Sequence, residues 1–344
     1  MHYPLKFEPL YKDYIWGGRK LESLGKTLPK NIVAESWEIA SHPDGTGIVS
    51  NGEYKGQPLN KLVIKHGSEL LGSAIYKDKN TKFPLLIKLI DANRDLSVQV
   101  HPNDDYAFIH ENGELGKNEM WYVVDTDPSA KLVSGIKDGI TKQDFQTAVK
   151  NGTIADCLNF IEVFPGDCIN VPAGLVHAIG AGCLICEIQQ NSNTTYRVYD
   201  YNRTDAAGNT RPLHIKKALD VIDFDAGEGG RTLGLTVTKN CLEKTFLVAN
   251  KYFAVEKIAM TGTITEDTYS ERFHCYTVLN GTITINNEVV ETGHSCLIPA
   301  SAGAYTISGT ATIIKSYVPD LEKNIHKPLL EAGYSRADID SIIS

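Results

Sequence analysis

Apolar and polar residues alternate along many short segments of the chain. In "LSVQVH" (96–101), Leu and Val alternate with Ser97, Gln99 and His101, which is the two-residue period of a half-buried strand. Comparable apolar segments lie at 32–40, 83–92, 119–124, 158–163, 168–172, 183–190, 252–260, 275–280, 281–286 and 311–318. Gly, Pro and Asn separate them, so the pattern predicts a mainly β protein built as antiparallel sandwiches or barrels.

Helical patterns are few. The spacing of apolar residues predicts a helix over 60–72. A second helix is expected at 141–152, between a capping pair, Thr141 and Asp144, and an Asn-Gly stop. The last segment, 327–344, predicts two short helices, the second capped by Ser335 with Asp338.

One turn-rich unit occurs twice. Gly166, Pro172 and His177 follow one another at fixed spacing, and the later segment repeats it with Gly293 and Pro299. The later copy has Ala304 at the position of the histidine. Because only the first copy has the histidine, we expect one active barrel and one supporting barrel.

Composition narrows the class of protein. The 344 residues are 42% hydrophobic and 22% charged, with no membrane-length apolar run and no signal-peptide pattern, so we expect a soluble cytoplasmic protein. The net charge of -8 argues against nucleic acid and leaves room for a small phosphorylated ligand at a local basic cluster. Of the seven cysteines, Cys183 and Cys186 form a CxxC whose sulfurs would point to opposite strand faces, which predicts buried structural thiols.

A candidate metal site emerges from the spacing. Gly-x5-Pro-x4-His matches the second motif of cupins, small barrels that hold a metal, although Ala181 replaces the usual final Asn. Gln99 and His101 point to one side of their strand, and Glu119 begins the next. A single histidine on a strand is more often structural, but His101, Glu119 and His177 together form a two-histidine, one-carboxylate set. With Gln99 as a fourth ligand, this set suits Zn²⁺ and tolerates Mn²⁺ or Fe²⁺. The remaining histidines are interpreted as structural.

Several motifs together resemble one family. "KLIDANRDLSVQVHPND", "GKNEMWYVV" and "VPAGLVHAIG…EIQQNSNTTYRVYDYNR" are similar to type I mannose-6-phosphate isomerases in their compact bacterial form, as are "YIWGG" and "VAESWEIASHP". The resemblance spans about residues 5–318.

The resemblance implies two cupin-type barrels and one Zn²⁺ per chain. It implies interconversion of D-mannose 6-phosphate and D-fructose 6-phosphate by a monomer or weak homodimer, without nucleic-acid or membrane partners. The family's metal ligands fall on Gln99, His101, Glu119 and His177, and its catalytic positions fall on Arg197 and Lys117. Trp16, Glu35 and Lys88 match positions that line its substrate cleft.

The chain departs from the family in three ways, two of them relative to its longer members and one relative to its usual compact form. Only 58 positions separate Glu119 from His177, which leaves room for a short helical insertion at about 138–158. Asn193 stands where longer members have an acidic residue, and a tail follows residue 318. We therefore predict a catalytic barrel over 1–240, a second, metal-free barrel over 241–318, and a helical tail over 319–344.

Two other functions share these residues. The metal set also fits an Fe- or Mn-dependent cupin oxygenase, and the barrels alone fit a non-catalytic sugar-binding cupin. Lys88, Lys117 and Arg197 favour a phosphorylated substrate, although Arg197 could instead pair with Asp200 or Asp205. For the isomerase, we expect the metal to act as a Lewis acid on an enediolate, with Lys117, Glu35 or a metal-bound water as candidate base.

Overall fold

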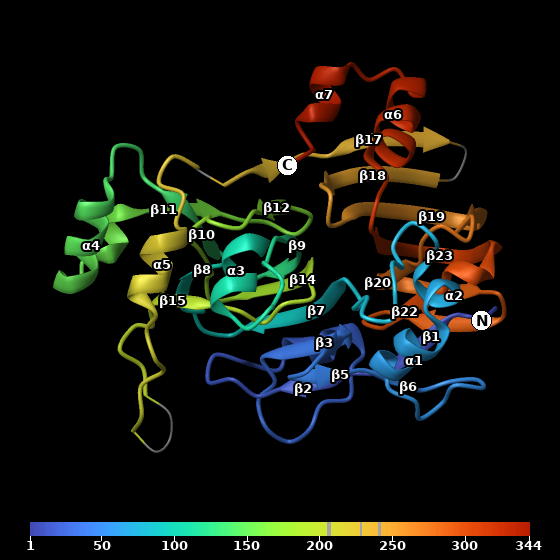
Figure 1. Ribbon diagram of the computed structural model, residues 1–344, viewed down its shortest axis with the longest axis horizontal. Helices are drawn as coiled ribbons and strands as arrows, with labels where there is room; N and C mark the ends of the chain where they lie inside the picture. The colour runs from blue at the N-terminus through green and yellow to red at the C-terminus, as the bar shows by residue number, and fades with distance from the viewer. Residues whose placement is uncertain (205–207, 228, 240–241) are drawn as a thin grey trace.

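The computed structural model describes residues 1–204, 208–227, 229–239 and 242–344. As predicted, the molecule is mainly β, with β-sheets arranged in layers and helices at the periphery (Figure 1). Among the described residues, no helix combines the length and the apolar character needed to cross a bilayer.

Two sheets form the N-terminal barrel. In hydrogen-bonded order, the larger contains β16 (Arg231–Thr232), β12 (Cys168–Val171), β9 (Glu119–Thr126), β14 (Cys183–Gln190), β7 (Leu85–Ala92), β3 (Glu35–Ile39) and β2 (Leu10–Lys12). The smaller contains β11 (Leu158–Glu162), β10 (Lys131–Ile136), β13 (His177–Ile179), β8 (Val98–Val100) and β15 (Tyr196–Tyr199). Apolar side chains from both sheets, among them Ile90, Trp121 and Ile179, fill the space between them. A separate pair, β4 (Ser41–His42) and β5 (Gly45–Thr46), lies outside these sheets.

A third sheet forms the C-terminal barrel. Its order is β17 (Leu235–Lys239), β18 (Leu242–Ala249), β19 (Ala254–Asp267), β23 (Ala304–Tyr317), β20 (His274–Ile285), β22 (Ser295–Ile298), β1 (Leu5–Glu8) and β6 (Ile48–Val49), with β21 (Glu288–Glu291) beside β20. One face of the long strands encloses an apolar core that includes Ile258, Val278 and Ile313. The opposite face packs on the larger sheet of the N-terminal barrel through residues such as Val255 and Ile314.

The first strand of the chain belongs to this third sheet. Leu5 of β1 pairs with Leu297 of β22, and Phe7 pairs with Val49 of β6. The two barrels therefore share a sheet as well as a core. The predicted boundary between 240 and 241 falls outside the described residues, and the division into domains stays a prediction.

The helices lie around these layers. They are α1 (Leu59–His66), α2 (Ser68–Leu71), α3 (Asp104–His110), α4 (Lys142–Asn151), α5 (Ile215–Val221), α6 (Lys327–Glu331) and α7 (Arg336–Asp340), with short turns of other helix types at η1 (Lys20–Leu24), η2 (Ile154–Cys157), η3 (Ala300–Ala302) and η4 (Glu322–His326). The predicted capping pairs are present at Thr141 with Asp144 and at Ser335 with Asp338. The expected helical insertion consists of α4 followed by the η2 turn.

Two expected elements differ from the structure. The single helix expected over 60–72 is divided into α1 and α2, because Gly67 adopts a φ of 45°, outside the helical range. The segments 275–280 and 281–286 form one continuous strand, β20. The register shifts between Val278 and Asn280, so the Asn-Gly pair produces a bulge instead of a turn. Cys183 and Cys186 contact different cores, which confirms that their side chains lie on opposite faces of β14.

Candidate functional site

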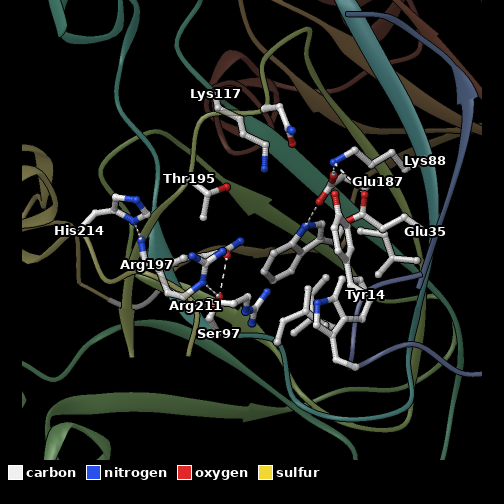
Figure 2. Close-up of a pocket in the computed structure, with 17 residues that line it drawn as sticks. Tyr14, Glu35, Lys88, Ser97, Lys117, Glu187, Thr195, Arg197, Arg211 and His214 are labelled. Atoms are coloured by element: carbon white, nitrogen blue, oxygen red, sulfur yellow. Dashed lines mark hydrogen bonds and ion pairs between the residues drawn. The ribbon is translucent and has the colours of Figure 1, made fainter. Parts of the chain in front are cut away.

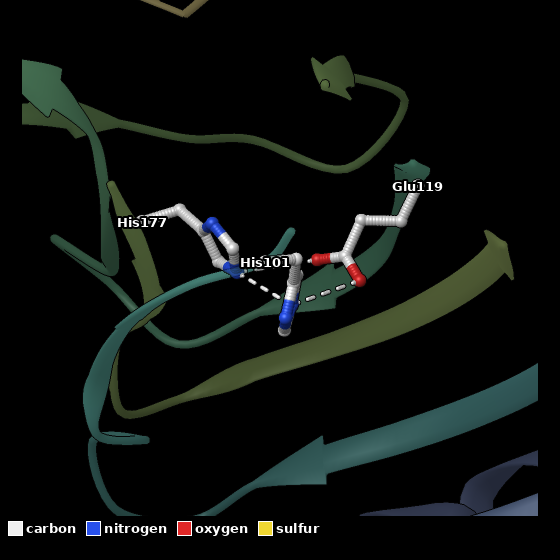
Figure 3. A group of neighbouring side chains, drawn as sticks. All are labelled: His101, Glu119 and His177. Carbon is white, nitrogen blue, oxygen red and sulfur yellow. Dashed lines mark hydrogen bonds and ion pairs between the residues drawn. The ribbon is translucent and has the colours of Figure 1, made fainter. Parts of the chain in front are cut away.

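Three buried side chains meet inside the N-terminal barrel. His101 follows β8, Glu119 begins β9, and His177 begins β13, so both sheets contribute (Figure 3). Nε2 of His101 lies 3.4 Å from Oε2 of Glu119, and Nε2 of His177 lies 3.4 Å from Oε1. The ligand atoms of all three lie within 4.8 Å of one another. This spacing and this mixture of nitrogen and oxygen atoms can hold a divalent metal.

Backbone carbonyls orient both imidazole rings. Nδ1 of His101 lies 2.9 Å from the carbonyl oxygen of Thr194, and Nδ1 of His177 lies 2.9 Å from that of Leu175. A carbonyl can only accept, so each Nδ1 carries the hydrogen and each Nε2 presents its lone pair. Burial and the neighbouring Lys117 ammonium lower the pKa of His101 to about 3, and burial lowers the pKa of His177 as well. Both rings are therefore neutral at pH 7, which is the form that binds metals.

Glu119 completes the set as a buried anion. Its side chain is inaccessible to solvent, and Nζ of Lys117 lies 2.5 Å from its Oε2 and 2.9 Å from Nε2 of His101. Burial on its own would raise the pKa of Glu119, but the Lys117 ammonium beside it lowers the pKa well below its usual range. Two imidazole lone pairs and a buried carboxylate anion thus converge on one point. This arrangement stabilises a positive charge there.

A cavity of about 280 Å³ lies next to this metal set. Gln99 connects the two, since it lines the cavity and its Nε2 lies 3.4 Å from Nε2 of His177. The other predicted residues that line the same cavity are Trp16, Glu35, Lys88, Lys117 and Arg197. The volume is near the lower end of ligand pockets, as expected for a small substrate. The structure thus brings all nine predicted site residues to one place, and their individual roles stay predictions.

One wall of the cavity is cationic. Arg197 of β15 and Arg211 lie together on this wall, with His214 beside them (Figure 2). Asp200 holds Arg211 through contacts of 2.5 and 2.8 Å. Arg197 donates to the Ser97 hydroxyl and the Pro212 carbonyl, and no carboxylate of the described residues pairs with it.

The sequence offers Asp200 and Asp205 as alternative partners for Arg197. Asp200 is not its partner, since Asp200 binds Arg203 and Arg211. Asp205 lies outside the described residues. Within the described part of the chain, the Arg197 guanidinium therefore keeps donors available to an anion.

The opposite wall carries a buried ion pair. Lys88 of β7 and Glu187 of β14 are directly paired across the strands, with Nζ 3.0 Å from Oε1 of Glu187 and 3.8 Å from Oε2 of Glu35 (Figure 2). The sequence suggested phosphate as the anion near Lys88, but the protein itself supplies two carboxylates. Although burial would lower the pKa of Lys88, Glu187 and Glu35 raise it above its ordinary value.

Glu187 differs from an ordinary surface carboxylate. The indole nitrogen of Trp121 donates to its Oε2 at 3.0 Å. Burial raises the pKa of Glu187, even though Lys88 opposes this effect. A carboxyl group with a raised pKa beside a small-molecule cavity is a candidate for proton transfer.

The cavity residues that sequence patterns did not predict as site residues include Tyr14, Glu187, Arg211 and His214. His214 was interpreted as structural, yet it lines the cavity and its Nδ1 accepts the backbone N–H of Arg197 at 3.2 Å. The one available signal was Glu187, a charged residue inside the apolar segment "CLICEIQQ". A buried charge needs a partner of opposite sign, and Lys88, in another apolar segment, is a residue of that kind.

Comparisons with known proteins agree with this geometry. The family model "Phosphomannose isomerase type I, catalytic domain" matches residues 5–131, and "Mannose-6-phosphate isomerase, cupin domain" matches residues 242–318. The chain is 40% identical to mannose-6-phosphate isomerase ManA of Bacillus subtilis over 92% of this chain and 99% of that protein. The chain belongs to the type I phosphomannose isomerase family.

Other members of the phosphomannose isomerase family show the same extent of similarity. The probable mannose-6-phosphate isomerase GmuF of Bacillus subtilis is 39% identical over 92% of this chain and all of its own length. The crystal structure of the Bacillus subtilis mannose 6-phosphate isomerase superposes with a TM-score of 0.83 at 34% identity, covering 91% of this chain and 99% of that one. The cupin architecture expected from the sequence is thereby confirmed, and the chain is an enzyme of this family.

Proposed function

We propose that this protein interconverts D-mannose 6-phosphate and D-fructose 6-phosphate with one bound Zn²⁺. The observation that carries the proposal is the position of the His101, Glu119 and His177 set next to a cavity whose wall is cationic, with Gln99 and Lys117 in contact with the set and lining the cavity. The family relationship supports the substrate, and the cavity contains charges of the appropriate sign. Lys88, Lys117, Arg197 and Arg211 line it against only two carboxylates, Glu35 and Glu187.

The donor set fits zinc. Two neutral imidazoles and a carboxylate form a common ligand combination for catalytic Zn²⁺. Gln99 turns its amide nitrogen towards His177 and its oxygen towards Ser97, so its amide would have to rotate to act as a fourth ligand. Nε2 of His101 and Nε2 of His177 lie only 3.1 Å apart, and both are acceptors, so a cation between them removes their mutual repulsion. A bound divalent ion would supply Lewis-acid stabilisation of negative charge on the sugar oxygens.

We assign the phosphate group to the cationic wall. Arg197 presents a planar guanidinium whose donors match phosphate oxygens, and Arg211 lies beside it with its position fixed by Asp200. Burial and the neighbouring Arg211 lower the pKa of Arg197, but it stays cationic at pH 7 because an arginine titrates so far above that pH. Holding the phosphate at this wall would direct C1 and C2 of the open-chain sugar towards the opposite wall.

The isomerisation moves one proton between two neighbouring carbons. A base removes the proton from C2 of the aldose to give an enediolate, a hydroxyl proton passes from O2 to O1, and the carbon proton is returned at C1, which leaves the ketose carbonyl at C2. Among the cavity carboxylates we assign this transfer to Glu187, since burial raises its pKa and Lys88 and Trp121 fix its position. Glu35 is the competing candidate, and its Oε2 already accepts the indole N–H of Trp37 at 2.7 Å.

A coupled assay of fructose 6-phosphate formation from mannose 6-phosphate tests the function directly. The protein is assayed as purified, after chelation, and after addition of Zn²⁺, alongside His101→Ala. Metal-dependent turnover that the variant lacks would support both the activity and the site. No turnover with any divalent ion would overturn the proposal and return attention to the oxygenase and sugar-binding alternatives.

A further inference from the structure

A second polar cavity, of about 320 Å³, lies in the C-terminal barrel. Lys244, Glu256, Glu266, His274 and Lys315 are among the residues that line it. Glu256, His274 and Lys315 are almost completely buried, with at most 4% of each exposed. None of these residues belongs to the metal set or to the cavity of the N-terminal barrel.

The register of the strands explains where this cavity lies. Glu256 of β19 pairs with Lys315 of β23, which pairs with Tyr276 of β20. Two residues further along the same face, Ile258 and Ile313 belong to the apolar core of the barrel. The interior of the second barrel is therefore apolar at its centre and charged at one end, where the cavity opens.

The C-terminal tail closes one side of the cavity. Lys323 and Asn324 of η4 and Pro328 of α6 are among its lining residues. Asn324 accepts a hydrogen bond of 2.6 Å from Arg272, and Leu329 is buried in the same apolar cluster as Phe246 and Tyr317. This tail lies beyond residue 318, where the match to the family's cupin domain ends. The cavity thus includes a wall that the matched domain does not supply.

The charges of this cavity are already matched internally. Lys244 lies 3.1 Å from Glu256 and 3.0 Å from Glu266, and Lys315 lies 2.7 Å from Glu266. Arg272 and Lys323 both contact Glu271, at 3.0 and 2.6 Å. An anionic ligand would have to compete with these carboxylates, in contrast to the N-terminal cavity, where Arg197 has no carboxylate partner among the described residues.

Uncharged hydroxyl groups fit the remaining donors and acceptors. An ammonium has three N–H donors, and the carboxylate contacts of Lys315 and Lys244 use one and two of them. Tyr269 lies at the rim with 66% of its surface exposed, and the Lys323 ammonium lies over its ring, 5.0 Å from the centroid. Tyr317 lies inside, with the Lys315 ammonium 5.0 Å from its ring centroid. The exposed side of the Tyr269 ring can cover the C–H face of a sugar while the charged groups bind its hydroxyls, each of which both donates and accepts.

The geometry points to a second ligand site in the C-terminal barrel that binds an unphosphorylated monosaccharide. The site is walled by the tail and is separate from the isomerase cavity. It selects a neutral polyol over a sugar phosphate because every cation that lines it has a carboxylate partner.

Calorimetric titration of the full chain with millimolar D-mannose tests this inference. The matched variants are Tyr269→Ala, at the rim of the second cavity, and Tyr14→Ala, which alters the N-terminal cavity. We expect Tyr269→Ala to weaken D-mannose binding about five-fold or more, and Tyr14→Ala to leave it unchanged. Amide exchange should slow at 269–274 and 322–328 when D-mannose is bound.

Three outcomes would overturn the inference: no D-mannose binding, binding weakened by Tyr14→Ala alone, or complete displacement of D-mannose by equimolar mannose 6-phosphate. None of these readouts uses isomerase activity. Failure of this inference and failure of the proposed function are therefore distinguishable.

Discussion

His101 and His177 present their Nε2 atoms to each other at 3.1 Å, while backbone carbonyls hold both Nδ1 hydrogens. Two lone pairs at this separation repel each other unless a positive charge lies nearby. In the described structure, the Lys117 ammonium lies 2.9 Å from Nε2 of His101. The tautomer that the carbonyls impose thus turns both Nε2 lone pairs to one point. Either the Lys117 ammonium or a metal ion can supply the positive charge that is needed there.

Metal removal should therefore abolish turnover. We expect chelation to lower kcat by about a hundred-fold or more, and Zn²⁺ to restore it, since a preorganised positive centre contributes several kcal/mol. His101→Ala should not be restored by Zn²⁺, and His110→Ala, at an exposed position, serves as the control. Full activity in protein shown to be metal-free would contradict the assignment.

Loss of the Arg197 guanidinium should weaken binding of the phosphate. Arg197→Ala is expected to raise KM for mannose 6-phosphate about ten- to a hundred-fold, the usual cost of a charge-assisted contact of about 1.5–3 kcal/mol. The exposed tail residue Arg336, changed to Ala, is the matched control. An unchanged KM would show that the phosphate binds elsewhere.

Glu187→Gln should affect chemistry more than binding. We expect kcat to fall about 10²- to 10⁴-fold, the range for removal of a general base, with a much smaller change in KM. Glu35→Gln compares the competing carboxylate, and Glu162→Gln, at an exposed position, controls for the loss of charge. If Glu35→Gln gives the larger loss of kcat, the proton-transfer role belongs to Glu35.

The pH profile provides an independent check on Glu187. Because burial raises the pKa of Glu187, the ionised base forms only at a higher pH than for an ordinary glutamate. The acid limb of kcat/KM should therefore lie above the usual carboxylate range, and it should be absent from the residual activity of Glu187→Gln. An acid limb at the ordinary glutamate pKa in the wild-type enzyme would argue against this role.

Stability should depend on pH through His274. Burial lowers the pKa of His274 well below its ordinary value, so below pH 6.5 the unfolded chain binds a proton that the folded chain does not. Stability is then complete above that pH and falls as the pH decreases, by up to about 1.4 kcal/mol per pH unit. In urea unfolding between pH 7 and pH 5, His274→Gln should show a smaller loss than wild type. Equal slopes would contradict this prediction.

Two adjacent leucines test how firmly the tail is attached. Leu329 is completely buried, whereas Leu330 is 37% exposed. Leu329→Ala should destabilise the packing of the tail by about 2–5 kcal/mol, and Leu330→Ala should stay within about 0.5 kcal/mol of wild type. Amide exchange over 321–342 measures the effect, because the tail can open without unfolding of the barrels. Equal protection in the two variants would show that the tail does not depend on Leu329.

Much of the candidate site could be predicted from the sequence because its residues lie on strands with clear periodicity. The position of Gln99 and His101 on one face of "LSVQVH", and of Glu119 at the start of the next strand, follows from a two-residue period. The fixed spacing from Gly166 to His177 supplied the third ligand. The local pattern was sufficient to predict these residues because each lies in or directly beside a strand, whose period sets the direction of the side chain.

The opposite wall required information that a local pattern does not contain. Lys88 and Glu187 are paired through the register of β7 with β14, two strands far apart in sequence. Arg211 and His214 lie in a segment without periodicity, and contacts with Asp200 and Arg197 fix their positions. The bulge in β20 was missed for the opposite reason, because an Asn-Gly pair is locally a strong turn signal and the partner strand overrides it.

The pairing of β1 with β22 has a consequence for biosynthesis. Strand β1 pairs with β6, which is close in sequence, and with β22, whose Leu297 lies far along the chain. The part of β1 that pairs with β22 therefore stays unpaired and exposed until the second barrel has been translated. A truncated chain that lacks the second barrel would keep that edge open, so we expect it to aggregate instead of forming a minimal enzyme.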